Sequence, residues 1–306
     1  MTSIDVRDLT KEYGGLRAVD QLTFSVRPGR VTGFLGPNGA GKSTTMRLAL
    51  GLDRPTSGTA TIGGQAYAAL REPLRRVGAL LDARAAHGSR TARDHLRALA
   101  ASNRITDRRV DAVLAETGLA AVARRRVRTY SLGMRQRLGI AAALLGDPEV
   151  ILLDEPANGL DPEGIVWIRT LLRRLAEEGR TLLVSSHLMS ETAAFADHLV
   201  ILGKGRLLAD TPVQEFIHAR VQPHVRIRST DPAALDDLLA RHGLDASRDA
   251  DGARTVRHAG VDDLGRIMAE AGVPVLELAA RDATLEEAYL DLTAAEAEFT
   301  ALTQEI

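Results

Sequence analysis

The stretch "GFLGPNGAGKSTTMRL", residues 33–48, places four glycines and a lysine between a short apolar run and a helical pattern. It fits the pattern G-x-x-x-x-G-K-[ST], in which backbone amides surround phosphates, the lysine reaches the terminal phosphates and the hydroxyl binds Mg²⁺. The positive end of the helix that begins near Lys42 attracts the same anion. The stretch therefore predicts a nucleoside triphosphate site, with an ordinary glycine-rich turn as the alternative. The residues expected to contact the nucleotide are Gly36, Pro37, Asn38, Gly39, Ala40, Gly41, Lys42, Ser43 and Thr44.

Length and composition are those of a globular protein. The 306 residues are 45% hydrophobic and 26% charged, which predicts one large domain or a large domain with a smaller one. The absence of cysteine excludes disulfides and thiolate metal sites. The N-terminus lacks a signal-peptide core, and no apolar run approaches the roughly 18–20 residues that cross a bilayer. We therefore expect a cytoplasmic protein whose role at a membrane depends on a partner.

The net charge of −1 conceals two halves of opposite sign. Residues 231–306 contain 17 acidic and 6 basic residues, whereas residues 1–230 contain 23 acidic and 33 basic residues. This asymmetry indicates two domains and argues against a nucleic-acid-binding tail at the C-terminus. A solvated acidic face explains the charge of the tail itself.

Three short apolar runs, "VTGFLG", "EVILLDEP" and "RTLLVSSH", are typical of buried parallel strands. The glycine loop follows the first run, Asp154 and Glu155 end the second, and His187 ends the third. Ligands of open α/β sheets bind outside the carboxyl ends of the strands. The sequence therefore predicts that phosphate-binding, acidic and imidazole groups meet at one edge of a sheet.

Each of these polar residues has an expected role and a plainer alternative. Asp154 suits Mg²⁺, because this cation is held by few carboxylates together with phosphate oxygens and water. Glu155 is placed to position or deprotonate the attacking water. An acidic turn after a strand is the alternative for this pair, and a structural histidine at a strand end is the alternative for His187.

The segment "RTYSLGMRQRLGIAAALLGDP" predicts an amphipathic helix with Ser131 as its N-cap. A capped helix N-terminus with Gly133 nearby is able to bind a phosphate. From this stretch alone, a plain helix cap is the more common interpretation.

The order of these motifs resembles that of ATP-binding-cassette (ABC) ATPases. "YSLGMRQRL" is similar to the signature motif of that family, and it stands just before "VILLDEPANGLDP" and, later, "SSH". The resemblance covers about residues 4–220. It implies that Tyr13 stacks on adenine, that Asp161 is the aspartate of the D-loop, and that His187 is the switch histidine.

The resemblance also implies a mechanism. In ABC ATPases two cassettes pair head to tail, and each ATP lies between the loop of one chain and the signature of the other. This chain holds one cassette, so a second copy is the expected partner, with Ser131 and Gly133 acting in trans. ATP closes the dimer and hydrolysis to ADP and phosphate reopens it, which drives an integral-membrane permease. The expected location is the cytoplasmic face of the cell membrane.

One position departs from the common pattern of the family. Where many cassettes carry a glutamine, "VGALLDAR" places Asp82, as in bacterial exporters of the bacitracin- and daunorubicin-resistance type. Asp82 is therefore a candidate Mg²⁺ ligand beside Ser43 and Asp154, and an ordinary loop acid is the equal alternative.

The expected organisation is a P-loop α/β cassette over residues 1–221 and a small α+β accessory domain over residues 222–306. The cassette should combine a parallel-sheet core, an antiparallel β part and an Arg- and Ala-rich helical subdomain at about 83–148. In the accessory domain we expect strands at "HVRIR" and "VPVLELA" and a final helix over "TLEEAYLDLTAAEAEF". That ending resembles the tail of ATPases that export drugs, antibiotics or lipids.

We therefore interpret the chain as the ATPase subunit of an ABC exporter. The alternative is a non-transport ABC ATPase that acts on ribosomes or nucleic acid, but the two-cassette chains and long coiled coils of such proteins are absent. A GTP switch is disfavoured because no N-K-x-D motif occurs. The arginines of "ARRRVR", residues 123–128, are not interleaved with aromatics, so no nucleic acid is expected.

Overall fold

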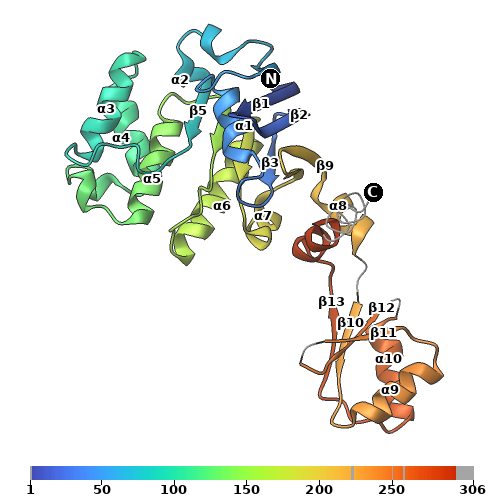
Figure 1. Cartoon of the computed structure of the whole chain (residues 1–306). Helices are drawn as coiled ribbons and strands as arrows, with labels where there is room; N and C mark the ends of the chain where they lie inside the picture. Colours follow the sequence, from blue (N-terminus) through green and yellow to red (C-terminus); the bar gives the residue numbers. More distant parts are fainter. Residues whose placement is uncertain (1, 222–223, 250, 258, 294–306) are drawn as a thin grey trace. The chain divides into compact units, whose positions relative to one another are not determined.

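The structure is a computed structural model that describes residues 2–221, 224–249, 251–257 and 259–293 (Figure 1). It divides into two compact units, one ending at Val213 and the other beginning at Gln214. The boundary that we inferred from the sequence, between 221 and 222, lies at the other end of helix α8 (Val213–Arg220). Among the described residues, no helix is both long enough and apolar enough to cross a bilayer.

A six-stranded sheet forms the centre of the first unit. Its strand order is β5-β6-β7-β3-β8-β9, with parallel pairing from β5 to β8 and an antiparallel edge strand β9. The three predicted strands are β3, β6 and β7, which are therefore direct neighbours. The strands are β5 (Val77–Leu80), β6 (Val150–Leu153), β7 (Thr181–Ser185), β3 (Arg30–Leu35), β8 (His198–Gly203) and β9 (Arg206–Pro212).

The register of this sheet places the polar strand ends side by side. Phe34 of β3 pairs with Ser185 of β7, and Leu153 of β6 pairs with Val184 of β7. Every residue of β6 and β7 is buried, which explains why both read as unbroken apolar runs. The residues that follow β3, β6 and β7 consequently emerge together at one edge of the sheet.

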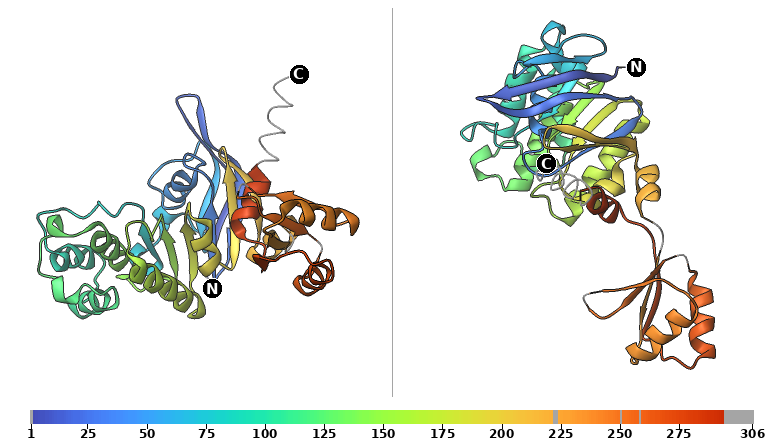
Figure 2. Two further views of the ribbon diagram at one scale, coloured as in Figure 1. Left: turned by 90° about the horizontal axis from the view of Figure 1, so that it is seen from below. Right: turned by 45° about the vertical axis from the view of Figure 1, so that its right-hand side comes forward.

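Each face of the sheet packs on a separate core, because successive side chains of a strand point to opposite faces. On one face, Ile151 and Leu153 of β6 join the apolar sides of helices α5 (Leu132–Leu144) and α6 (Pro162–Glu177). On the other, Val150 and Leu152 join helix α1 (Lys42–Ala49) and an antiparallel sheet of order β2-β1-β4. The strands of that sheet are β1 (Ile4–Tyr13), β2 (Leu16–Val26) and β4 (Ser57–Ile62), and Figure 2 shows the long blue β1–β2 hairpin from two further sides.

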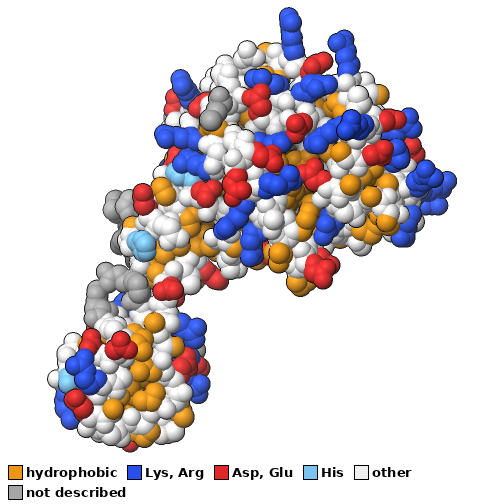
Figure 3. All heavy atoms as spheres, turned by 180° about the vertical axis from the view of Figure 1, so that it is seen from behind, with side chains coloured by type: hydrophobic (Ala, Val, Ile, Leu, Met, Phe, Trp, Pro, Cys, Tyr) orange, Lys and Arg blue, Asp and Glu red, His pale blue; other side chains and the backbone are white. Residues whose placement is uncertain are grey.

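A group of helices lies to one side of the six-stranded sheet (Figure 1). Leu96, Val110, Val113 and Leu138 from three of these helices are fully buried in a shared core. On the face drawn in Figure 3, basic and acidic side chains of the first unit are interspersed, so that face does not present the continuous basic surface typical of nucleic-acid binding. The remaining helices of this unit are α2 (Pro73–Arg76), α3 (Ala92–Ser102), α4 (Asp107–Glu116) and α7 (Met189–Phe195), with short 3₁₀ turns at Tyr67–Ala69, Ala120–Val122 and Val127–Thr129.

The second unit is a split βαβ fold with a four-stranded antiparallel sheet of order β11-β12-β10-β13. The predicted strand "VPVLELA" was wrong at its start, since the strand begins at Glu277. Helix α10 ends at Glu270, Gly272 then adopts a left-handed conformation (φ 67°), and the chain needs the next residues to return to the sheet. The elements are β10 (His224–Arg228), α9 (Pro232–Arg241), β11 (Ala246–Arg248), β12 (Arg254–Arg257), α10 (Val261–Glu270) and β13 (Glu277–Arg281).

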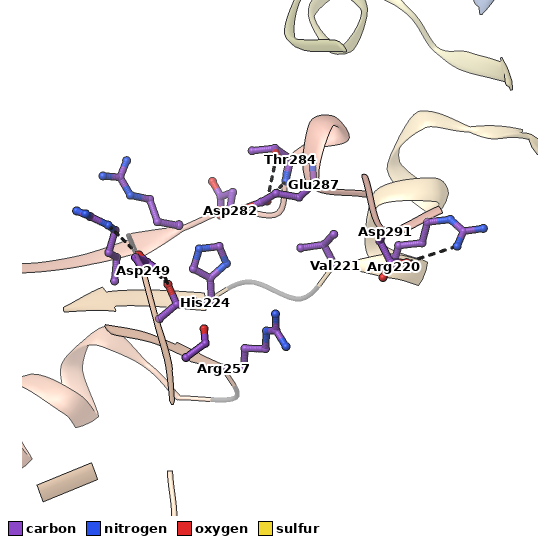
Figure 4. A pocket seen from close by; sticks show the side chains of 13 residues that line it. Arg220, Val221, His224, Asp249, Arg257, Asp282, Thr284, Glu287 and Asp291 are labelled. Atoms are coloured by element: carbon purple, nitrogen blue, oxygen red, sulfur yellow. Dashed lines mark hydrogen bonds and ion pairs between the residues drawn. The ribbon is translucent and has the colours of Figure 1, made fainter. Parts of the chain in front are cut away.

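The two faces of this smaller sheet differ in chemistry. Val225, Ile227 and Val256 pack on α9 and α10, whereas the polar face lines a cavity of about 780 Å³ (Figure 4). The guanidinium of Arg226 forms ion pairs there with Asp249, Asp251 and Glu277. One guanidinium thus neutralises only part of the charge of these three carboxylates.

The final predicted helix begins as expected. Residues 285–293 are helical, and the side chain of Thr284 caps this helix by accepting a 3.2 Å hydrogen bond from the Glu287 amide. Its apolar residues Leu285, Ala288 and Leu292 are buried. Residues 294–299 of the predicted helix lie outside the described residues.

The separation of the cores predicts that the first unit folds alone. A chain that ends at Val213 should unfold cooperatively and bind ATP with an affinity within about twofold of the full chain, because neither large core of the first unit contains a residue beyond Leu202. Thermal unfolding and a nucleotide titration of the truncated chain measure both properties. Loss of ATP binding by a folded truncated chain would contradict this independence.

Candidate nucleotide-binding site

The glycine loop joins β3 to α1 and is shaped by close backbone contacts. Gly36 has φ 147°, and a Cβ atom there would lie 2.5 Å from the carbonyl oxygen of Leu202. Gly41, the N-cap of α1, has φ 102°, and its Cβ would lie 2.6 Å from the carbonyl oxygen of Ala18. A side chain at either position is therefore excluded by both space and dihedral angle. These two glycines fix the loop around the N-terminus of α1, where an anion binds.

The loop borders a cavity of about 210 Å³. The loop and the two acidic residues that follow β6 thus share one cavity, as the sequence predicted. Its lining residues are Ala18, Asn38, Gly39, Ala40, Gly41, Lys42, Ser43, Thr44, Asp154 and Glu155.

The ammonium of Lys42 is held by backbone carbonyls. Its Nζ donates to the carbonyl oxygen of Gly36 at 2.6 Å and to that of Pro37 at 3.2 Å, and only 7% of the residue is exposed. Burial lowers the pKa of Lys42, while the carboxylates of Glu155 and Asp154 oppose that shift. The carbonyls neutralise no charge, so the cation remains available to a phosphate.

A chain of hydrogen bonds links the loop to the ends of β6 and β7. Ser43 Oγ donates to Asp154 Oδ2 at 2.6 Å, and Ser185 Oγ donates to Asp154 Oδ1. The same Ser185 oxygen accepts a 2.9 Å hydrogen bond from the backbone amide of Glu155. We did not predict Ser185 from the sequence. Its signal was a hydroxyl at the end of a buried strand, two residues before His187.

The carboxylate of Glu155 meets the imidazole of His187, whose Nδ1 lies 2.7 Å from Glu155 Oε2. The backbone of Glu155 is in the left-handed region (φ 50°), which is uncommon for a residue other than glycine. Its carbonyl oxygen accepts a 2.8 Å hydrogen bond from Nε2 of Gln136, a buried side chain of α5. Gln136 also escaped the sequence analysis, because it stands between Arg135 and Arg137 in a polar stretch of that helix, where its burial is not apparent.

Ser131, Gly133 and Asp161 form a second cluster that does not line the loop cavity. Ser131 caps α5 by accepting a 3.2 Å hydrogen bond from the amide of Met134, and Asp161 caps α6 in the same way. A Cβ at Gly133 would lie 2.9 Å from the carbonyl oxygen of Gly159, so the start of α5 packs directly on the segment before α6.

Tyr13 and Asp82 also lie outside the lining of the cavity. The hydroxyl of Tyr13 donates to Asp53 at 3.0 Å, and the ammonium of Lys11 stands 4.7 Å from the centre of its ring. Asp82 is exposed, and its carboxylate accepts a 2.8 Å hydrogen bond from the amide of Arg84. Neither residue contacts the loop in this arrangement.

The donor set at the loop suits a hard cation. The Ser43 hydroxyl and one Asp154 oxygen are already 2.6 Å apart, and both are oxygen ligands of the kind that Mg²⁺ takes together with phosphate oxygens and water. The residues present therefore fit magnesium.

Comparison with known proteins assigns the chain to a family. Residues 19–158 match the family model "ABC transporter", and residues 223–286 match a domain of unknown function, DUF8746. The bacitracin transport ATP-binding protein BcrA of Bacillus licheniformis is 38% identical over 298 residues, which are 95% of this chain and 97% of that protein. The chain belongs to the ABC transporter ATP-binding family.

Further similarities agree with this assignment. The Nod factor export ATP-binding protein I of Burkholderia orbicola is 34% identical over 96% of this chain and 97% of that protein. The dimeric ABC transporter cassette MJ0796 superposes with a TM-score of 0.63 at 26% identity, covering 68% of this chain and 98% of that one. A post-hydrolysis dimer of the same cassette holds ADP and phosphate, with a TM-score of 0.62 and 25% identity. The predicted P-loop cassette fold and its ATPase activity are thereby confirmed.

The contacts of Ser185 generate a test of this ABC cassette. Ser185→Ala should lower kcat for ATP hydrolysis about 10-fold or more, because hydrogen bonds to a charged group and to a buried amide disappear. The affinity for ATP should change by less than about threefold, since the loop is untouched. The hydroxyl of the neighbouring Ser186 bonds to the backbone of Leu188 and not to Asp154 or Glu155, so Ser186→Ala is the matched control. Equal effects of the two substitutions would refute the role of Ser185.

Proposed function

We propose that this cassette powers an ABC exporter, in which it works with a separately encoded membrane permease. The relatives that match along almost the whole chain, including the second unit, are ATP-binding proteins named for bacitracin transport and Nod factor export. Their shared role supports outward transport of an antibiotic, drug or lipid-like compound. The protein would then be peripheral on the cytoplasmic face of the cell membrane.

The convergence of the loop, Asp154, Glu155 and His187 supports the following division of labour. Lys42 and the loop amides, from Gly36 to Thr44, bind the phosphates. Glu155 takes a proton from the attacking water or positions it, and His187, at 2.7 Å from Glu155, orients that carboxylate and the terminal phosphate. Ser43 and Asp154 hold Mg²⁺, which neutralises charge on the phosphate oxygens when it is bound.

The location of the signature residues supports a shared site. Ser131 and Gly133 do not line the loop cavity of their own chain, so they are free to contact ATP that is bound to the loop of a second copy. Asp161 follows Leu160, whose Cα would lie 3.8 Å from a Cβ at Gly133, so it lies near the same junction. The dimeric cassettes among the solved structures support pairing of two copies.

Two assignments depend on the bound nucleotide. We propose that Tyr13 stacks on adenine with its exposed ring, of which Lys11 covers one face. We also propose that Asp82 contributes to the Mg²⁺ site, directly or through water. The ATP affinities of Tyr13→Phe and Tyr13→Ala test the stacking role, because the Phe variant keeps an aromatic ring and the Ala variant does not. The Mg²⁺ affinity of Asp82→Asn tests the role of the carboxylate.

The substitution Glu155→Gln tests the catalytic assignment. It should lower kcat at least about 100-fold, because an amide cannot accept the proton, and it should leave ATP affinity nearly unchanged. ATP-bound dimers should then accumulate, which sedimentation measures. Near-normal steady-state hydrolysis by this variant would remove Glu155 from its assigned role.

Co-expression with a membrane protein tests the export function. The chain is co-expressed with the product of a neighbouring reading frame that has several apolar spans. It should co-purify with that protein from detergent-solubilised membranes and show ATPase activity that transport stimulates. The Lys42→Ala variant should co-purify without activity, because it lacks the cation that binds the terminal phosphates. Co-purification with ribosomes or nucleic acid instead would favour a non-transport ABC ATPase.

A further inference from the structure

Gln136 joins two parts of the cassette that serve different nucleotides. It lies on α5, the helix whose N-terminus carries Ser131 and Gly133. Its side chain is 4% exposed, and its Nε2 donates a 2.8 Å hydrogen bond to the backbone carbonyl of Glu155. A signature residue of the helix acts on the ATP of the second copy, whereas Glu155 acts on the ATP of its own copy.

This contact helps to hold the backbone of Glu155 in an uncommon conformation. Its φ of 50° is unfavourable for a residue with a Cβ, so surrounding contacts must hold it. The amide of Glu155 donates to Ser185 Oγ at 2.9 Å, and its carbonyl accepts from Gln136 at 2.8 Å and from the amide of Asn158 at 3.2 Å. The peptide groups on either side of the Glu155 Cα are thus fixed by side chains from β7 and from α5.

The helix is able to transmit a displacement over this distance. Ser131 is the N-cap of α5 and Gln136 follows five residues later, about 7.5 Å along the axis of a continuous helix. Gly133 packs on the carbonyl of Gly159, so the start of α5 is also attached to the segment that follows Glu155. A shift of the signature end of α5 therefore displaces the amide that holds the Glu155 carbonyl.

We propose that Gln136 is a positioning residue that couples the two ATP sites of the dimer. When the signature of one copy closes on the ATP of the other copy, Gln136 sets the orientation of Glu155 in its own copy. This proposal rests on the proposed function, in which Glu155 is catalytic in cis and Ser131 acts in trans. It predicts that the contact matters in the copy that carries the working Glu155, and not in the copy that lends its signature.

A linked dimer with one working carboxylate separates these two effects. Two copies are joined by a flexible linker, and Glu155→Gln is placed in the second copy, so hydrolysis uses Glu155 of the first copy and Ser131 of the second. Gln136→Met, which preserves side-chain size and removes the donor, is then placed in either copy. Both proteins contain the same substitutions, and equal thermal unfolding shows that folding does not separate them.

With Gln136→Met in the first copy, kcat should fall about 10-fold or more while KM for ATP changes by less than about threefold. With the same substitution in the second copy, the loss should be several times smaller. An equal loss, or a larger loss from the second copy, would show that Gln136 merely supports the signature helix and would overturn the proposal. Hydrolysis by the linked dimer with Glu155→Gln in both copies would instead reject the proposed catalytic role.

A double-mutant cycle tests the coupling itself. Ser131→Arg in the first copy damages only the site that already lacks its carboxylate, and it should nevertheless slow hydrolysis by Glu155 of that first copy. Because Gln136 carries this effect, adding Gln136→Met should produce a combined loss smaller than the product of the two single losses. Losses that multiply independently would show that the signature acts by another route, and would overturn the coupling. Ser131→Arg in the second copy should abolish activity if the signature acts in trans. If the same substitution in the first copy then has no effect, the trans arrangement is supported and the coupling proposal is overturned.

Discussion

The hydrogen-bond chain that runs from Ser43 through Asp154 and Ser185 to Glu155 organises this cassette. It connects groups at or beyond the ends of β3, β6 and β7. These groups come together because the three strands are neighbours and their carboxyl ends lie at the same edge of the sheet. The two cores on either face of the sheet hold that register, since a slip of one residue would exchange the side chains between the cores. The large apolar interior therefore fixes the spacing of a few polar atoms.

The sequence predicted the parts of the site that depend on short local patterns of residues. The spacing of its glycines and lysine predicts the phosphate loop. Uninterrupted apolar runs that end in polar residues predict the strands β3, β6 and β7. Parallel strands bring their carboxyl ends together, so the sequence was sufficient to predict that Lys42, Asp154 and Glu155 share one cavity and that His187 lies beside Glu155.

The parts that escaped prediction depend on pairings between distant segments. Nothing in the local sequence marks Ser185 or Gln136. Their importance comes from hydrogen bonds to Glu155, which lies 30 and 19 positions away in the sequence. The start of β13 was misplaced for a related reason, since an apolar run does not reveal where the chain rejoins a sheet after a left-handed Gly272. The inferred domain boundary followed the change of pattern just before "HVRIR", whereas the structure groups the residues of α8 from Gln214 onward with the second unit.

The charges of the site are close together but do not cancel before a nucleotide arrives. Lys42 is bound by two neutral carbonyls, Asp154 by two hydroxyls, and Glu155 by a histidine and by backbone contacts. A direct Lys–carboxylate pair would have to be broken when phosphate binds, at the cost of its Coulomb energy in a partly buried place. Uncharged partners are displaced at a lower electrostatic cost. Burial lowers the pKa of Lys42, and a bound phosphate opposes this effect because its negative charge stabilises the ammonium. The cassette thus holds Lys42 and Asp154 on uncharged hydrogen-bond partners, which suits the binding of ATP with Mg²⁺ that we propose.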